Sequence, residues 1–450
     1  MKKYKKIALA LGLLIVVLFI LPFLVPMQTY LQKAERIASE KLGVPVTIAN
    51  GHLRFLPSPR LVAGDIVIGE NQDVKIEKLV IVPTLSSLFS ETKQINLKVT
   101  KPIIKKTALT IISALSAKSP EGAEAAAVNV SHINIDEMQL AWPDIQLPML
   151  NAEIVLTELN QLDSALIESL DGNLKADIVP DGDARLITVN ADKWTLPVGL
   201  PLLIDKAKVE MQLKGNRLTI PKIDVALYGG KLVGDAVLTW QENKGAENWK
   251  ANGHLNVMNL SVKQPSSMMS RTVYLSGNLF GDGDFSASAK EVGQLAERLQ
   301  ASFKFKINQG ILHGLDLVKV ASLLIKQNQS GGETQFDTFS GLLKVSGKQY
   351  HLRDLNISSG LLAATGQIEV KSNKQLDGVV EVKVKNSVGL VAIPLNVSGT
   401  LKDPVVLPSK MALVGAAAGT AILGPGVGTS LGIKAAGAVD SIKNLFGGDK

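Results

Sequence analysis

Apolar and polar residues alternate with a period of two along most of the chain after residue 45. The alternation is plain in Lys208–Leu213, in Phe303–Ile307, where Lys304 and Lys306 fill the polar positions, and in Val380–Lys385. Strict alternation places one face of a strand against apolar surroundings and the other face in water. Because the pattern recurs in so many segments, we expect a mainly β protein with few helices, built on an antiparallel sheet.

Short turn signals and a few helical patterns interrupt this alternation. Glycine-containing turn motifs are expected at Pro180–Asp183, Gly215–Asn216, Tyr228–Gly230, Gly281–Asp284, Ser359–Gly360 and Asp377–Gly378. Apolar residues at helical spacing predict helices over Thr29–Leu42, Glu291–Gln300 and Leu315–Gln327. The segment Gly215–Val225 also resembles Gly347–Ile357, which indicates either a strand–turn–strand unit used twice or chance alternation.

The N-terminal residues have the pattern of a membrane anchor. Lys2, Lys3, Lys5 and Lys6 precede Ile7–Val25, a run without a charged residue. As a helix this run is roughly 28 Å long, which matches the hydrocarbon core of a bilayer. The lysines place the N-terminus in the cytoplasm and the rest of the chain on the other side. A cleaved signal peptide is the alternative, but the run is long for one and no small-x-small cleavage site follows it.

A second uncharged segment lies near the C-terminus, over Met411–Ile433. Its glycines have the spacing of close helix contacts in membranes, whereas Gly424–Gly426, with a central proline, breaks any helix in the middle. A re-entrant hairpin, a tail that docks on the sheet or on a partner, and a second span remain open. The expected organisation is thus a cytoplasmic start (1–6), a transmembrane helix (7–26), an N-terminal region (27–116), a linker (117–127), a β-rich region (128–410) and an apolar tail (411–450).

Composition excludes several classes of protein. The chain has no cysteine, so disulfides, thiolate zinc sites and cysteine nucleophiles are absent. The formal net charge of +7 falls to +3 without the four N-terminal lysines, which gives no argument for nucleic-acid binding. Aromatic residues make up only 4% of a chain that is 46% hydrophobic, so its apolar surface is mostly aliphatic.

No metal-binding or nucleotide-binding motif is present in the sequence. The five histidines are dispersed and lack metal-ligand spacing, and the Asp-Gly-Asp pieces at residues 181–183 and 282–284 lack the other ligands of a calcium loop. The chain has no P-loop and no dinucleotide-binding motif. We therefore expect no cofactor, no metal and no enzymatic activity, although carboxylates from distant strands could still converge.

The apolar face of the sheet is the best candidate for a functional surface. Either a second sheet covers it, as in a sandwich, or the sheet curls into an open trough. Burial of an acyl chain of around 15 carbons in such a trough would gain on the order of 10 kcal/mol before the costs of binding. The expected lining residues are the apolar members of two strongly alternating segments, Phe303, Phe305, Ile307, Val380, Val382 and Val384.

The chain resembles the AsmA family of bacterial envelope proteins. The N-terminal part of the resemblance covers Glu35–Gly69 and Lys75–Ile104. The C-terminal part covers, in the same order as in the family, Gly281–Ser288, Lys306–Leu324, Thr338–Val370 and Ile393–Ser409. The chain departs from the family at Leu299–Ala301, where a leucine-glycine pair is usual.

The resemblance implies a single-pass protein of the Gram-negative inner membrane whose periplasmic part is an elongated, curved antiparallel sheet with an apolar groove, similar to bridge-like lipid-transfer proteins. Membrane lipids, phospholipids above all, are the implied partners, and transport of phospholipid or maintenance of the outer membrane is the implied function. The rival is a structural or assembly factor that acts on outer-membrane proteins through a periplasmic or outer-membrane protein partner and carries no lipid.

Overall fold

The structure, a computed structural model, describes residues 27–84, 87, 92–108, 111, 128–142, 146–197, 200–243, 246–321, 332–360, 362–386, 389–410 and 412–414. It divides into two compact units, Met1–Pro201 and Leu202–Lys450. The expected transmembrane helix over residues 7–26 with its lysines, the linker 117–127 and the tail beyond Val414 lie outside the described residues. Within the described part, no helix combines the length and hydrophobicity that a membrane span requires.

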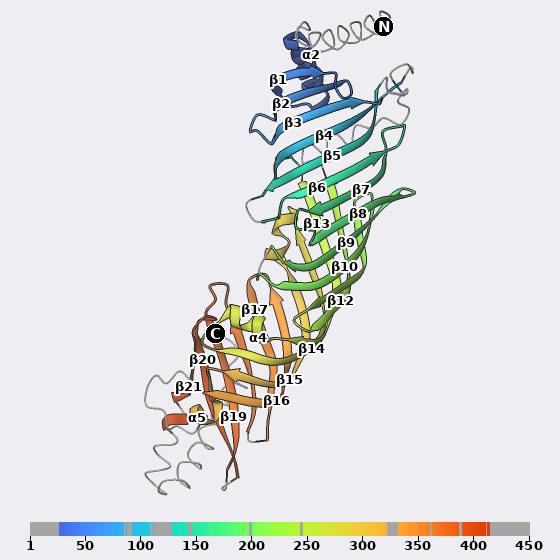
Figure 1. Cartoon of the computed structure of the whole chain (residues 1–450). Helices are drawn as coiled ribbons and strands as arrows, with labels where there is room; N and C mark the ends of the chain where they lie inside the picture. Colours follow the sequence, from blue (N-terminus) through green and yellow to red (C-terminus); the bar gives the residue numbers. More distant parts are fainter. Residues whose placement is uncertain are drawn as a thin grey trace, which may run out of the picture. The chain divides into compact units, whose positions relative to one another are not determined.

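The first unit begins with a helix and continues with strands (Figure 1). Its described elements are α2 (Met27–Leu42), β1 (Val46–Arg54), β2 (Arg60–Ile68), β3 (Val74–Pro83), β4 (Lys93–Lys105), β5 (Val128–Ala141), β6 (Leu150–Leu156), β7 (Leu162–Ser169), β8 (Leu174–Asp181) and β9 (Ala184–Thr195). Each strand from β1 to β9 pairs with the next along the chain.

One of these pairings differs from the expected antiparallel sheet. Strands β4 and β5 run parallel, with Lys93 opposite Val128 and Lys105 opposite Ala141. Parallel neighbours cannot be joined by a tight hairpin, because the chain must return to the end from which it started. The stretch between Lys105 and Val128 is long enough for the crossover that a parallel pair requires.

Helix α2 confirms the helical pattern of Thr29–Leu42. Ala38 and Leu42 of α2 pack against a small core of Val46, Ala63 and Ile66 from the first two strands. The helix ends at Gly43, whose φ of +71° is a left-handed conformation that glycine adopts without strain. The helix thus covers part of one sheet face at the start of the first unit.

The second unit is a sheet of antiparallel neighbours with short helices in two of its connections (Figure 1). Its described strands are β10 (Leu203–Lys214), β11 (Arg217–Leu227), β12 (Gly230–Asn243), β13 (Ala246–Ser261), β14 (Tyr274–Ala289), β15 (Gln300–His313), β16 (Glu333–Ser346), β17 (Gln349–Ser358), β18 (Leu362–Val370), β19 (Leu376–Asn386), β20 (Gly389–Gly399) and β21 (Pro404–Pro408). Helix α4 (Lys263–Met269) precedes β14, and α5 (Leu317–Ala321) follows β15.

The second unit is not a sandwich of two stacked sheets. Its described strands, β10 to β21, belong to one sheet, in which each strand is hydrogen-bonded to the next along the chain. A sandwich instead consists of two separate sheets that pack face to face. The interpretation in which a second sheet covers the apolar face is therefore wrong for the described part of this unit.

Two predicted helices are shorter than expected. In place of a helix over Glu291–Gln300 the structure has two 3-10 turns, η2 (Val292–Gln294) and η3 (Ala296–Arg298), and Gln300 already begins β15. Helix α5 realises only part of the expected Leu315–Gln327, and residues 322–330 lie outside the described range. The first segment is a strand connection whose ends are held by the hairpin that β14 and β15 form, so no long helix fits there.

Two predicted turns are strand interiors. The Gly281–Asp284 motif lies in the middle of β14, and Asp377–Gly378 lies within β19. Gly281 is opposite Phe305 and Gly283 is opposite Phe303 on β15. These glycines therefore make room for neighbouring groups and do not reverse the chain.

The internal repetition corresponds to two similar hairpins. Gly215 between β10 and β11, and Gly347 between β16 and β17, have φ values of +52° and +59°. In β11 the register shifts after Ile220, and in β17 it shifts after Leu352. A hairpin followed by an irregular strand thus occurs at both places, as the sequence similarity indicated.

Candidate functional site

A continuous row of apolar residues crosses the second unit at right angles to its strands. Residues directly opposite each other in an antiparallel pair share one face of the sheet, so a chain of such pairs can be followed from strand to strand. The apolar row, as we call it, contains one residue from each strand from β10 to β20: Val209, Ile223, Gly234, Leu255, Gly283, Phe303, Leu343, Leu352, Ile368, Gly378 and Val397.

The apolar row is neither buried nor fully exposed. All its members are half-buried except Val397, which is 6% exposed. The described strands form one sheet, so no second sheet covers this face in the part of the chain that the structure describes. The row is thus an apolar strip of the kind that a ligand could cover.

Glycines let the larger side chains of the row lie flat against the sheet. A methyl group added to Gly234 would come within 2.9 Å of Cδ2 of Leu255, and one added to Gly283 within 2.9 Å of Cδ2 of Phe303. Both are closer than van der Waals contact allows. The side chains of Leu255 and Phe303 therefore occupy the space above the two glycines and lie close to the sheet surface, so that the apolar row continues across these strands.

The other face of the same strands is polar. Its corresponding row from β10 to β17 is Lys208, Asp224, Val233, Asn256, Asp282, Lys304, Leu342 and Arg353. Asp224 forms an ion pair of 2.9 Å with Lys231, and Lys208 forms one of 2.8 Å with Glu210. Charged groups at these positions stay hydrated, so this face is the one that turns to water.

Helix α5 covers one part of the apolar face. Its Leu317 and Val320 pack in one core with Leu362, Val382 and Leu395 from β18, β19 and β20. Val382 and Leu395 have no exposed surface. This corner of the sheet is therefore a closed hydrophobic core made by the protein itself.

A hollow of about 700 Å³ adjoins this core at the end of the apolar row. Gly378 and Val397 of the row contribute to its walls, together with Val320 of α5. Leu407 and Leu413, which are 52% and 48% exposed, line it from β21 and the segment that follows. The volume lies within the range of ligand pockets in proteins.

Helix α4 lies over another part of the same face. Val262, just before α4, packs with Ile307 and Phe336 in a second buried core. After α4, Ser270 Oγ and Thr272 Oγ1 both donate hydrogen bonds to the carbonyl oxygen of Lys402, at 3.0 and 3.1 Å. Lys402 lies in the turn between β20 and β21, so the connection that carries α4 joins β14 to a distant hairpin of the same unit.

The six predicted lining residues share one face of the sheet. Ile307 connects to Val382 through direct pairs with Phe339, Ile357 and Ala364. Phe303, Phe305, Val380 and Val384 are half-buried, whereas Ile307 is 4% and Val382 0% exposed. Of the lysines between them, Lys304 and Lys306 are exposed. Contact of the six residues with lipid stays a prediction, and Ile307 and Val382 are covered here by the protein's own side chains.

Sequence reasoning missed most of the apolar row. Only Phe303 belongs to both sets, while residues such as Val209, Ile223, Leu255 and Leu352 were not nominated. Alternation around Val209 and Leu255 marks them as facing one side of a strand. The alignment of these strands with one another depends on the ladder register, which alternation within one segment does not reveal.

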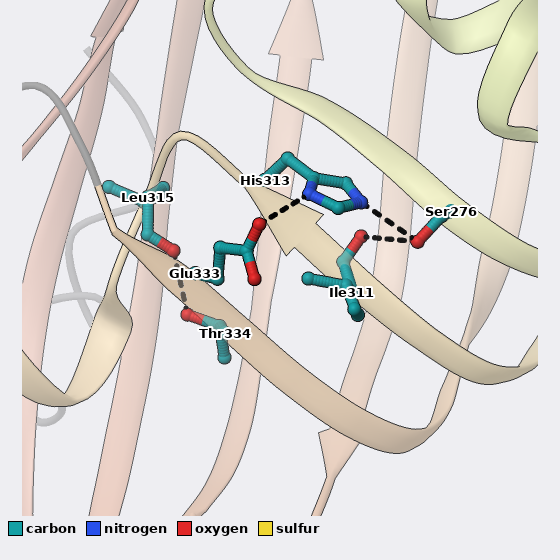
Figure 2. Close-up of polar contacts among 6 residues, drawn as sticks. All are labelled: Ser276, Ile311, His313, Leu315, Glu333 and Thr334. Carbon is teal, nitrogen blue, oxygen red and sulfur yellow. Dashed lines mark hydrogen bonds and ion pairs between the residues drawn. The ribbon is translucent and has the colours of Figure 1, made fainter.

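A polar cluster fastens three strands at one end of the sheet. Figure 2 shows His313 with Nδ1 2.8 Å from Glu333 Oε1 and Nε2 3.0 Å from Ser276 Oγ. The ring of Tyr274 stacks on His313 at 4.5 Å between centroids. Serine, histidine and carboxylate follow one another as in a hydrolase triad. These three residues line none of the hollows found in the described part of the chain, so none of those hollows could hold a substrate beside them. The cluster joins β14, β15 and β16 through side chains.

A second histidine pairs with a carboxylate on the polar face. His254 Nδ1 lies 2.8 Å from Asp284 Oδ1. This hydrogen bond raises the pKa of His254, and the charges of Asp284, Asp282 and Asp235 act in the same direction. Within the described residues, no three histidine or acidic side chains form a group that could hold a metal ion.

Comparison with known proteins gives one match. Residues 179–354 match the model of the AsmA family. No curated protein and no solved structure matches the chain. The matched range includes the apolar row from Val209 to Leu352, so the strip of half-buried side chains lies largely in the part of the chain that has the family's sequence pattern.

Proposed function

The chain belongs to the AsmA family through its residues 179–354, and from this premise we propose that it carries lipid, with acyl chains held on the apolar row of the second unit. The observation that supports the proposal is the row itself. It has no polar residue on any strand from β10 to β20, its members other than Val397 are half-buried, and the described strands form a single sheet without a second one over the row.

The dimensions of the row suit lipid tails. Eleven strands with a spacing of about 4.8 Å make the row roughly 48 Å long. One leaflet of a bilayer has an acyl region of about 15 Å, so several chains could lie along the row. Each buried CH₂ contributes about 0.8 kcal/mol, which favours coverage of the strip by any acyl chain over its exposure to water.

The composition of the row favours movement along it. Its members are aliphatic, aromatic or glycine, and none is polar. A ligand held only by nondirectional apolar contact meets similar free energies at successive positions, because no hydrogen bond specifies one site. Lipid transport requires this property, whereas a storage site would hold its ligand at fixed polar groups.

The proposed location is the Gram-negative inner membrane, with one span over residues 7–26, the N-terminus in the cytoplasm and the remainder in the periplasm. The basic residues Lys2, Lys3, Lys5 and Lys6 and the uncharged run that follows support this orientation. Phospholipid is the proposed cargo, and transport toward the outer membrane or its maintenance is the proposed role.

The free edge of the sheet favours a second candidate function. Among the described residues β21 pairs only with β20, and Val405 and Leu407 of β21 are 40% and 52% exposed. An unpaired edge with exposed apolar side chains can accept a strand from another protein. A structural or assembly factor that acts through a periplasmic or outer-membrane protein would use this edge and would need no lipid.

Site-specific photo-crosslinking in the full chain separates the two functions. A photoreactive amino acid in place of Leu255 or Phe303 probes the apolar row. The same photoreactive amino acid in place of Lys304, one position from Phe303 and on the opposite face, is the matched control. After irradiation in cells, mass spectrometry of the purified protein identifies the crosslinked molecule.

We expect phospholipid adducts from Leu255 and Phe303 and few from Lys304. Equal lipid capture on both faces would indicate nonspecific contact with membrane and contradict the proposal. The photoreactive amino acid is also placed at Val405 and at Leu407 on the free edge. Crosslinks to another protein from these two positions, with no lipid captured on the apolar row, would favour the assembly factor.

A further inference from the structure

Two arginines face each other at the end of the first hairpin without an acidic partner. Arg54 of β1 is directly opposite Arg60 of β2. Like charges at opposed positions of an antiparallel pair are destabilising. Among the residues that the structure describes, neither guanidinium forms an ion pair, whereas Lys98 and Lys101 of β4 pair with Asp136 and Glu77.

The hydrogen bonds of this pair leave donors unused. Arg60 donates from Nη2 to the carbonyl oxygen of Leu56 at 2.6 Å, while its Nε is buried and has no partner. Arg54 donates from Nε to Nε2 of His52 at 3.1 Å, so this ring nitrogen acts as an acceptor. A buried guanidinium N–H without an acceptor is costly, and an anion would satisfy it.

These groups line a hollow of about 350 Å³ on one face of β1, β2 and β3. Lys78 adds a third permanent positive charge to its walls. Of the two carboxylates in the lining, Glu77 lies 3.5 Å from Lys101, which balances its charge. Asp65 accepts a hydrogen bond from the neutral amide of Asn50, at 3.1 Å from Nδ2, and keeps its negative charge. Three positive side chains thus share the hollow with one unbalanced carboxylate, and the net charge is positive.

We infer that this hollow binds a phosphate group. Guanidinium groups bind phosphate through pairs of parallel N–H donors, and a lysine adds a point charge. A phosphate seated between Arg54 and Arg60 would turn their repulsion into attraction to a common anion. The site is in the first unit and is separate from the apolar row, so it goes beyond the proposed function. A phospholipid headgroup and free phosphate share the chemistry that the site recognises.

Calorimetric titration of the full-length protein in detergent tests the site. Inorganic phosphate and a soluble short-chain phosphatidylglycerol are titrated separately to distinguish the two sources. The variants are Arg54→Gln and Arg60→Gln, and Arg36→Gln on the exposed surface of α2 is the matched control. Loss of one charge-assisted pair is expected to weaken binding about tenfold or more, with no change in Arg36→Gln.

The two probes then assign the source. If phosphatidylglycerol binds much more tightly than phosphate and both lose affinity in the variants, the hollow is a site for a lipid headgroup. If the two probes bind the wild-type protein with equal affinity, the hollow is a site for free phosphate. Absence of binding to the wild-type protein, or equal binding by Arg54→Gln, Arg60→Gln and wild type, overturns the inference.

Thermal unfolding gives an independent measurement. Phosphate should raise the melting temperature of the wild type but not of Arg54→Gln, whose side chain is exposed and whose replacement removes the repulsion with Arg60 together with one exposed hydrogen bond to His52. An equal rise in both proteins contradicts the site. Lipid crosslinking at Leu255 should be the same in Arg54→Gln and wild type, so failure of this inference and failure of the proposed function are distinguishable.

Discussion

Gly283 lies directly opposite Phe303 in the ladder between β14 and β15, and the ring of Phe303 occupies the space where a side chain on residue 283 would be. A Cβ at residue 283 would also come within 2.2 Å of the carbonyl oxygen of Ser302. The glycine is thus required by the packing of its neighbours, and it keeps the phenylalanine flat on the apolar row.

The substitution Gly283→Val tests this relationship. Valine would push the Phe303 ring and the β15 backbone away, and overpacking of this kind costs about 1–3 kcal/mol. We expect a corresponding decrease in the free energy of unfolding, measured by urea denaturation, and reduced lipid crosslinking at Phe303. Ser286→Val, on the exposed polar face of the same strand, is the control and should change neither measurement. Wild-type stability in Gly283→Val would show that the ring has space to move.

The substitution Val382→Asp is expected to destabilise the protein. Val382 has no exposed surface and packs in the core beneath α5, so an aspartate there would be a buried charge without a partner. The expected loss is about 3 kcal/mol or more in the free energy of unfolding. The same change at Thr365, an exposed residue on β18, should cost little. Equal stability of the two variants would mean that α5 does not cover Val382 in solution.

The pair His254 and Asp284 predicts a pH dependence. The hydrogen bond to Asp284 raises the pKa of His254 above its ordinary value of 6.5, because it stabilises the protonated ring. This stabilisation is fully present below pH 6.5 and is lost as the pH rises through the higher pKa of the folded state.

NMR titration of the imidazole resonances in wild type and Asp284→Asn measures this effect. We expect a lower pKa for His254 in the variant and a smaller difference at high salt, since the pair is on the surface. An unchanged pKa would show that the two side chains are not paired in solution.

The hydrogen bonds from Ser270 and Thr272 to Lys402 predict the dynamics of α4. Replacement of both hydroxyl groups in Ser270→Ala/Thr272→Val removes both hydrogen bonds to Lys402, each worth about 0.5–1.5 kcal/mol. It also removes the local bond between the two hydroxyl groups and the one that Ser270 Oγ accepts from the Val273 N–H. Hydrogen exchange should become faster in residues 263–272, because the segment loses its connection to the hairpin of β20 and β21. Ser267→Ala removes only a local bond to the carbonyl oxygen of Gln264 and serves as the control. Unchanged exchange in the double variant would mean that the core around Val262 alone holds α4 in place.

The sequence predicted the class of fold because alternation is a local property. Each strand needs one apolar face, so residues such as Phe303 and Phe305 are separated by lysines wherever the partner strands lie. Helix α2 was predicted from its amphipathic spacing and terminal glycine for the same reason. The predicted turn at Gly281–Asp284 was wrong because glycine next to aspartate is typical of turns, whereas here the need for space opposite two phenylalanines decided the conformation.

By itself, the sequence determined that the protein has many half-apolar strands, no cysteine chemistry and a resemblance to the AsmA family, since composition and alternation are properties of the chain alone. The tertiary structure decided which apolar residues are half-exposed and which are covered. The register aligned Val209 with Val397 across the ladder, and the connections of the chain placed Val262 against Ile307 and α5 over Val382. Both outcomes depend on contacts between residues far apart in the chain, and local alternation does not specify such contacts.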